Sequence, residues 1–266
     1  MTNFHRMFGA ALMGVAMVSV SVPAVAADAA LKAAVTGSWR TPENAARDAY
    51  RHPEAALAFW GLKPGMTVVD VNPGNKGWWT EILAPYAKAT GGAYVAAAPN
   101  VTGYSAGDPV VVGTVKAYAL SPSVNEVPAG SADMVLVARM FHNWARQDGT
   151  TEAYMTAFNT MLKPGGILAV EQHRAPEGSD PKAGTGYVPE SYVIDAAKKA
   201  GFELVAKSEI NANPKDTRDH PFGVWTLKPI RQSAARGQQP AADFDRAKYD
   251  AIGESDRMTL KFKKVK

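Results

Sequence analysis

Short apolar runs recur along the chain, and each is followed by a segment with helical character. The runs expected to form strands are Thr67–Val71, Ala93–Ala96, Thr114–Tyr118, Asp133–Ala138, Gly166–Val170 and Phe202–Ile210. Continuous β-branched runs of this kind are typical of strands buried on both faces, as in a parallel sheet. Segments 78–88, 151–162 and 191–200 lie between them and have the pattern of helices. This alternation predicts a doubly wound α/β sheet.

The composition excludes cysteine-dependent sites and bears on the kind of ligand that the chain binds. The chain has 266 residues, no Cys and a formal net charge of +4. The lack of Cys excludes disulfides, thiolate nucleophiles and Cys-ligated metal centres. The small net charge gives no reason to expect nucleic acid or an anionic membrane surface as a partner. We therefore expect a small-molecule ligand, and the sequence does not indicate an oligomeric state.

Residues 1–26 have the layout of a secretory signal peptide. An apolar run follows Arg6, and the small residues Ala24-Val25-Ala26 close the segment. The run is shorter than the roughly 20 residues that a membrane anchor needs. We expect cleavage near Ala26, which leaves a single domain over residues 27–266 that is periplasmic or secreted, with no membrane segment after cleavage.

Residues 40–64 are expected to form a helical cap in front of the sheet. Thr41 and Pro42 suit the cap and the first position of a helix, and Pro53 interrupts the helical pattern.

The other end of the chain carries an insertion and a last strand. Residues 211–255 are rich in Pro, Gly, Asp and Arg, and we expect this long segment to hang over the pocket mouth. Met258, Leu260 and Phe262 alternate with polar residues, which predicts a final half-exposed strand. The lysines of the tail fit the solvated face of an edge strand.

The turn at residues 72–77 follows the first predicted strand, at the place where open α/β sheets bind ligands. Gly74 and Gly77 allow the backbone to pass close to a ligand, and Asp70 lies at the strand end. A dinucleotide fingerprint is incomplete here, because Asn72 replaces its first Gly and no acidic residue follows at the required distance. By itself the turn fits a cofactor cradle and a plain structural turn equally well.

Several motifs together resemble class I S-adenosylmethionine-dependent methyltransferases, and specifically the branch of predicted exported methyltransferases. They are the segments Val68–Gly77, Met161–Leu168, Arg51–Glu54, Phe59–Met66, Trp79–Tyr86, His142–Trp144, Gly223–Leu227 and Glu254–Phe262. The resemblance covers about residues 40–266. It implies a Rossmann-like, seven-stranded doubly wound sheet with N-terminal helices and an insertion before the last strand.

The same resemblance implies S-adenosylmethionine as the cofactor. The residues that it places against the cofactor are Asp70, Asn72, Gly74, Gly77, Asn100 and Phe141. Two positions depart from the family pattern: Asn72 stands for the usual first Gly, and Asn100 stands where a carboxylate normally holds the ribose hydroxyls. An uncharged acceptor lacks the strength of a charge-assisted hydrogen bond. We therefore expect weak binding, with a dissociation constant in the tens to hundreds of micromolar if an unimpaired site has about 1 µM.

Titratable residues follow the two strands expected at the centre of the sheet. His142 is a candidate general base, because the ordinary pKa of a histidine lies near working pH. Arg139 and His173 are the further catalytic candidates. Glu171 and Arg174 follow the neighbouring strand, and Arg139 or Arg174 is able to clamp an acidic substrate group. Packing of a loop by these residues is an equally open interpretation.

Further candidates lie in the predicted acceptor region and the insertion. The substrate-binding set is Trp144, Glu171, Arg174, His220, Asp256 and Arg257. Asp256 and Arg257 also fit a structural ion pair. His142, Glu171 and His173 have the residue types of a metal site but not a helical ligand spacing, so no metal is predicted.

Two functions of different classes follow from these residues. The first is an exported methyltransferase that acts on an unknown small-molecule acceptor. The alternative is a non-catalytic periplasmic binding protein that keeps the fold and has lost the cofactor, because a fold alone never fixes a function.

Overall fold

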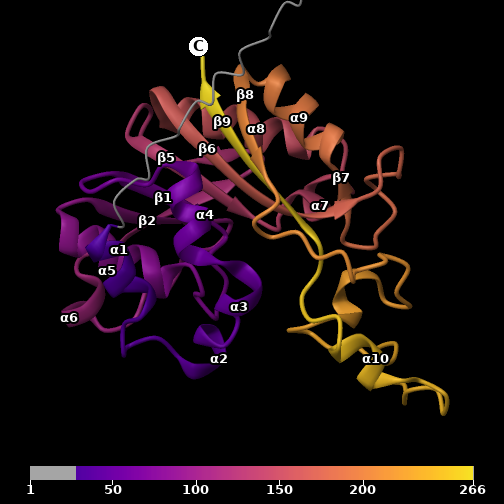
Figure 1. Cartoon of the computed structure of the whole chain (residues 1–266). Helices are drawn as coiled ribbons and strands as arrows, with labels where there is room; N and C mark the ends of the chain where they lie inside the picture. The colour runs from indigo at the N-terminus through magenta and orange to yellow at the C-terminus, as the bar shows by residue number, and fades with distance from the viewer. Residues whose placement is uncertain (1–27, 266) are drawn as a thin grey trace, which may run out of the picture.

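A nine-stranded sheet organises residues 28–265, the part of the chain that the computed structural model describes (Figure 1). Its strands are β1 (Thr67–Val71), β2 (Ala93–Ala98), β3 (Lys116–Ser121), β4 (Val124–Asn125), β5 (Ala132–Ala138), β6 (Leu162–Ala175), β7 (Val188–Pro189), β8 (Phe202–Ser208) and β9 (Arg257–Lys264). They follow the order β4-β3-β2-β1-β5-β6-β9-β8, and β7 pairs with β6. The predicted Rossmann-like α/β architecture is confirmed. The expected strand number of seven is corrected to nine, because the two-residue strands β4 and β7 join the sheet.

The strand directions place a crevice at the end of β1. This strand is parallel to β2 on one side and to β5 on the other. The chain builds the half with β2, β3 and β4 first and then crosses to the other side of β1 to build the half that begins with β5. Ligands bind at such a switch point, beyond the carboxyl ends of the strands. Among the long strands of residues 28–265, β9 runs antiparallel to both of its neighbours, β6 and β8.

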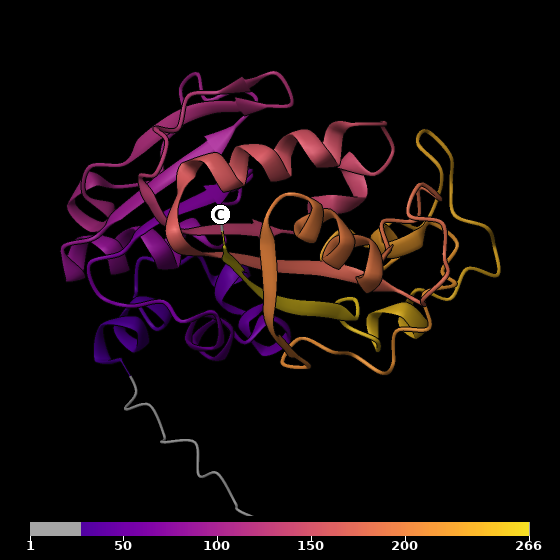
Figure 2. The same ribbon diagram turned by 90° about the horizontal axis from the view of Figure 1, so that it is seen from above.

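Helices cover both faces of the sheet (Figure 2). They are α1 (Ala29–Val35), α2 (Pro42–Ala45), α3 (Asp48–Arg51), α4 (Pro53–Trp60), α5 (Thr80–Thr90), α6 (Pro109–Val112), α7 (Phe141–Trp144), α8 (Thr150–Met161), α9 (Glu190–Lys199) and α10 (Arg246–Asp250), with one 3-10 turn, η1 (Gly223–Thr226). The predicted helix start at Pro42 and break at Pro53 are confirmed. His52 adopts a left-handed conformation (φ 43°) between α3 and α4, and this ends one helix before the next begins.

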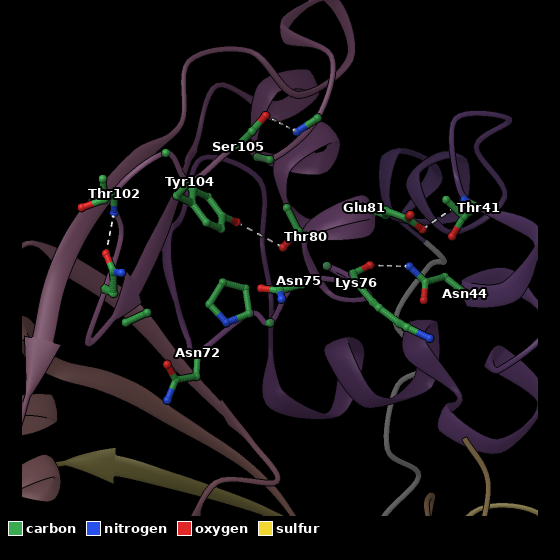
Figure 3. Close-up of a pocket in the computed structure, with 18 of the residues that line it drawn as sticks. Thr41, Asn44, Asn72, Asn75, Lys76, Thr80, Glu81, Thr102, Tyr104 and Ser105 are labelled. Atoms are coloured by element: carbon green, nitrogen blue, oxygen red, sulfur yellow. Dashed lines mark hydrogen bonds between the residues drawn. The ribbon is translucent and has the colours of Figure 1, made fainter. Parts of the chain in front are cut away.

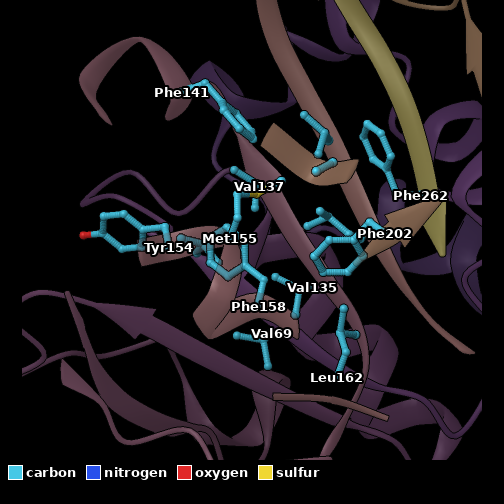
Figure 4. Packing of buried hydrophobic residues seen from close by; sticks show 14 of the residues in the cluster. Val69, Val135, Val137, Phe141, Tyr154, Met155, Phe158, Leu162, Phe202 and Phe262 are labelled. Atoms are coloured by element: carbon cyan, nitrogen blue, oxygen red, sulfur yellow. The ribbon is translucent and has the colours of Figure 1, made fainter. Parts of the chain in front are cut away.

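Two hydrophobic clusters lie on opposite faces of the sheet because strand side chains alternate in direction. Val69 of β1 and Val135 of β5 belong to the cluster that packs under α8 and α9 (Figure 4). Their neighbours Val68 and Met134 belong to the cluster under α1, α4 and α5. The central strands are therefore buried on both faces, as their apolar runs predict.

The last strand, β9, differs from the half-exposed edge strand that its sequence pattern predicts. β9 lies between β6 and β8, so it is an inner strand, not a half-exposed edge strand. Met258, Thr259 and Leu260 are all buried, although they alternate in polarity. Lys264 donates from Nζ to the carbonyls of Asn159 and Leu162, so this lysine of the tail is not simply solvated.

The N-terminal prediction lies outside the described residues, since the expected signal peptide spans residues 1–26. Between residues 28 and 265, no helix has the length and apolar character needed to cross a membrane.

Candidate functional site

A cavity of about 1190 Å³ opens at the carboxyl ends of β1 and β2. Its lining comes from four stretches: residues 41–44, the turn 72–77 with Thr80 and Glu81 of α5, the loop 98–107, and Met140 after β5. Figure 3 shows Tyr104 and Ser105 on one side and Asn44 and Glu81 on the other. The cavity therefore occupies the crevice that the strand order creates.

The turn 72–77 is shaped by left-handed backbone at Asn72 (φ 54°), Gly74 (φ 70°) and Gly77 (φ 53°). A Cβ atom on Gly77 would lie 3.2 Å from the Cβ of Thr80, so a side chain there would crowd the start of α5. Asn44 ties the N-terminal segment to the turn, because its Nδ2 donates to the carbonyl of Lys76 over 2.7 Å. The predicted cofactor residues Asn72, Gly74 and Gly77 all line the cavity.

Asn100 also lines the cavity, on the side formed by the loop after β2. Its Oδ1 accepts a hydrogen bond from the backbone N–H of Thr102 over 2.9 Å. The lining holds two carboxylates, Glu43 and Glu81, and both come from the opposite side. The loop side thus offers neutral polar groups, as the sequence indicates.

Asp70 is buried beneath the cavity and does not line it, although it is predicted to contact the cofactor. The Tyr94 hydroxyl donates to its Oδ2 over 2.9 Å, and the same hydroxyl lies 2.8 Å from Oγ1 of Thr80. Burial raises the pKa of Asp70 to about 7, against the opposing effects of the Tyr94 hydrogen bond and the Arg139 charge. Asp70 is therefore connected to the cavity through Tyr94, which contacts the lining residues Thr80 and Tyr104.

Two aromatic candidates belong to the core. Phe141 is fully buried and Trp144 nearly so, with ring centroids 5.2 Å apart. Trp144 also stacks on Tyr154 of α8, with centroids 4.3 Å apart. The predicted roles of Phe141 in cofactor binding and Trp144 in substrate binding are corrected, because α7 directs both rings between the sheet and α8.

A cluster of buried charges lies at the carboxyl ends of β5 and β6. Nη1 of Arg257 is 2.7 Å from Oε1 of Glu171, and Nη1 of Arg139 is 3.7 Å from the same oxygen. Glu171 is fully buried, and neither of its carboxylate oxygens has a hydrogen bond of good geometry. Three of the predicted site residues therefore come together here, beside the cavity lining at Met140.

The cluster includes three residues to which sequence reasoning assigns no role. Oε1 of Glu254 accepts from Nε of Arg47, and its Oε2 accepts from Nε of Arg51, both over 2.8 Å. Glu254 also accepts from Nη1 of Arg257 over 3.0 Å. No local signal identifies these partners, since more than 200 residues separate Arg51 from Glu254 in the chain.

The two histidines lie next to each other but away from the cavity lining, with ring centroids 5.6 Å apart. Nδ1 of His142 is 3.3 Å from Nε2 of Gln172, and Nδ1 of His173 is 2.5 Å from Oγ of Ser255. Burial lowers the pKa of His142 to about 4 and the pKa of His173 well below its usual value. Both rings are therefore neutral near pH 7. Within residues 28–265, no group of three His, Asp or Glu side chains is placed to hold a metal ion.

The insertion lies beside β6 and β9, and none of the residues 211–255 lines the cavity. Figures 1 and 2 both place α10 and its flanking loops at the end of the molecule opposite α6. Trp225 packs against His142, with centroids 5.8 Å apart. The expectation that this segment hangs over the pocket mouth is therefore corrected: it packs over the histidines.

The remaining candidates are engaged within the protein. Arg174 donates to both oxygens of Asp256 and to both oxygens of Glu209. His220 lies 2.8 Å from the buried Asp216, which also accepts from the Tyr187 hydroxyl. Arg174 thus joins β6 to the residues that flank the insertion, His220 is held within the insertion by Asp216, and Asp216 is tied to the rest of the domain through Tyr187.

Comparison with known proteins identifies the fold. No protein-family model matches the chain, and no curated protein matches it significantly by sequence. A protein from Galdieria sulphuraria, described as a sarcosine dimethylglycine methyltransferase, matches with a TM-score of 0.53 and 12% identity, over 84% of this chain and 87% of its own. The cyclase SpnF matches with a TM-score of 0.52 and 13% identity, over 81% of this chain and 80% of its own.

A third solved structure, the CurJ carbon methyltransferase, matches with a TM-score of 0.50 and 11% identity, over 86% of this chain and 57% of its own. At these identities the likeness establishes the fold. The chain has the class I fold of S-adenosylmethionine-dependent methyltransferases.

Proposed function

We propose that this chain is an exported S-adenosylmethionine-dependent methyltransferase that acts on a small-molecule acceptor. The observation that carries the proposal is the large cavity at the switch point, lined by the left-handed turn at residues 72–77. When bound, the cofactor would supply a methyl group on a positively charged sulfur, for transfer to a lone pair of the acceptor with the sulfur as the leaving group.

The residues of the cavity fit this cofactor in kind. The backbone of the turn 72–77 passes the ligand without obstruction at Gly74, where an added Cβ would meet nothing within 4 Å. Asn100, Thr102, Tyr104 and Ser105 offer neutral polar groups and one aromatic ring on the other side. These residues would hold the adenosine part, and the turn would hold the part nearer β1.

Asn100 would limit the affinity. Its Oδ1 already accepts from Thr102 and keeps one lone pair, so Asn100 offers the two ribose hydroxyls a single uncharged acceptor where a carboxylate would offer two charged oxygens. A hydroxyl without an acceptor costs about 1–3 kcal/mol, or roughly one to two orders of magnitude in the dissociation constant.

Calorimetric titration with S-adenosylmethionine and S-adenosylhomocysteine tests the proposal. We expect saturable binding in the tens to hundreds of micromolar, and Asn100→Asp should tighten it about tenfold by restoring a charged acceptor. Asn125→Asp is the matched control, because Asn125 makes the same kind of turn, with Val127 N–H, on the exposed strand β4. It should leave the affinity unchanged.

The alternative function is a non-catalytic binding protein that has lost the cofactor. The neutral loop at Asn100 favours it, and the cyclase SpnF shares the fold, so the fold does not dictate methyl transfer. Absence of binding by the folded wild type and by Asn100→Asp, up to millimolar cofactor, would decide for this alternative.

A further inference from the structure

Arg139 lies where the cavity and the buried charge cluster meet. It is the residue after β5, and Met140, which follows it, lines the cavity. Arg139 adopts a left-handed backbone (φ 60°), which is uncommon for a side chain of this size. Its N–H donates to the carbonyl of Glu171 over 2.7 Å, which fixes this conformation at the end of the two central strands.

The guanidinium of Arg139 lacks a hydrogen-bond partner at one of its buried nitrogens. Its Nη1 is buried without a hydrogen-bond partner, and the nearest carboxylate, that of Glu171, is 3.7 Å away. The side chain as a whole is 25% exposed, so it is also open to a molecule from outside. A buried donor without an acceptor is costly in a folded protein, unless a ligand supplies the acceptor.

The cluster has an excess of positive charge. Arg47, Arg51, Arg139 and Arg257 share the two carboxylates of Glu171 and Glu254, as described above. Nη1 of Arg51 and Nε of Arg257 are further buried donors without partners. The neighbouring His142 and His173 add no negative charge.

The partly exposed members of the cluster are Arg139, at 25%, and Arg47, at 16%, whereas the side chains of Arg51 and Arg257 are 1% exposed. Burial lowers the pKa of Arg139, Glu171 opposes this effect, and the positive charges of Arg257 and Arg47 lower the pKa further. An anion at this point would relieve that repulsion. Arg174, the other sequence candidate for a clamp, is excluded because Asp256 and Glu209 already occupy it.

We infer that the methyl acceptor carries a carboxylate, and that Arg139, assisted by Arg47, binds it beside the cofactor cavity. This inference rests on the proposed function. A planar guanidinium matches a carboxylate with two parallel, charge-assisted hydrogen bonds, which are stronger than hydrogen bonds between neutral groups. The acceptor atom would then be held between the cluster and the turn at residues 72–77.

Binding of matched probes tests the inference. Benzoate and its neutral isostere benzamide are titrated by NMR into the protein, both free and saturated with S-adenosylhomocysteine. We expect benzoate to bind at least about tenfold more tightly than benzamide. Arg139→Gln should abolish the preference, and Arg139→Lys, which keeps the charge without the fork, should retain part of it.

Arg231→Gln is the matched control, since Arg231 pairs through an exposed side chain with Asp250 and with neither Glu171 nor Glu254. It should keep the full preference. Equal affinity for the two probes in the wild type, or a preference that survives in a folded Arg139→Gln protein, would overturn the inference. Melting curves of both Arg139 variants confirm that each is folded.

A second arm separates the acceptor from the cofactor's own carboxylate. S-adenosylhomocysteine carries a carboxylate, and 5′-methylthioadenosine does not. If Arg139→Gln weakens only S-adenosylhomocysteine, the arginines hold the cofactor and the inference is wrong. If neither nucleoside binds the wild type, the proposed function fails, while the benzoate arm on the free protein still decides whether the anion site exists.

Discussion

Asp70 shows how one buried residue couples to the cavity without facing it. Asp70 is only 1% exposed, and its carboxylate accepts a hydrogen bond from the Tyr94 hydroxyl. Tyr94 in turn contacts Thr80, which lines the cavity at the start of α5. Desolvation has the largest effect on the pKa of Asp70 and favours the neutral form of its carboxyl group.

The raised pKa of Asp70 predicts a pH-dependent stability. Since its pKa is about 7 in the folded protein and 3.8 ordinarily, the folded state holds an extra proton between these values. The contribution of Asp70 to the free energy of unfolding is therefore full below about pH 4 and lost as the pH rises to about 7. Asp70→Asn keeps a neutral group that accepts from Tyr94.

The difference in free energy of unfolding, Asp70→Asn minus wild type, should thus grow from pH 4 to pH 7 and then level off, reaching about 4 kcal/mol at most. Urea unfolding across this range measures it. Asp243→Asn, at an exposed position, is the control for loss of a surface carboxylate. A flat difference would show that Asp70 ionises without penalty.

At the scale of elements, the start of β9 is held by ionic contacts to the N-terminal helices. Glu254 precedes β9 and accepts hydrogen bonds from Arg47, the N-cap residue of α3, and from Arg51, the last residue of α3. Arg257, the first residue of β9, adds a contact to Glu254 and one to the carbonyl of Tyr50. These contacts join α3 to β9, while Trp60 of α4 donates to the carbonyl of Leu260 over 3.0 Å.

Glu254→Gln should therefore destabilise the protein strongly. Removal of this carboxylate leaves three arginines with one fewer counter-charge, and breaking a buried ion pair costs about 3–5 kcal/mol. Glu209→Gln is the control, because Glu209 pairs with Arg174 but its side chain is 66% exposed, and surface pairs contribute about 0–1 kcal/mol. Urea denaturation compares the two. Equal, small losses would show that the cluster does not hold β9 in place.

At the scale of the whole molecule, the carboxyl ends of the strands carry two adjoining sites of different character. The cavity over β1 and β2 is lined mainly by neutral polar groups and glycines, with Glu43, Lys76 and Glu81 as its charged residues, whereas the cluster over β5 and β6 consists of arginines and carboxylates. The insertion closes the far side by packing Trp225 and Ser255 against the histidines. A cofactor and an anionic acceptor would thus meet near Met140.

Export is a prediction at this scale. Asp28 caps α1 by accepting from the N–H groups of Ala30 and Leu31, and it accepts from the Tyr86 hydroxyl of α5. Cleavage after Ala26 or Ala27 would leave this cap intact. Intact-mass measurement on protein from the producing cell should therefore give an N-terminus at Ala27 or Asp28. Full-length chain with Met1 in a cytoplasmic fraction would contradict export.

The sequence by itself determined the longer strands and helices and their order along the chain. Val68 to Val71 form a strand buried on both faces because neighbouring helices cover both sides of the sheet, and this leaves a local trace in the apolar run. The break at Pro53 and the turn at residues 72–77 are likewise local, since Pro and Gly restrict or release the backbone where they stand. The neutral cavity side at Asn100 also follows from the residue type alone.

Only the tertiary structure decided which side chains meet. β9 became an inner strand through antiparallel pairing with β6 and β8, and its alternating polarity carried no sign of this. The arginine cluster joins α3, the end of β5 and the start of β9, so no window of sequence contains it. Phe141 turned into the core while the adjacent Met140 lines the cavity, because the short helix α7 sends consecutive side chains in different directions. Periodicity is a property of near neighbours, whereas a binding site depends on contacts between residues far apart in the chain.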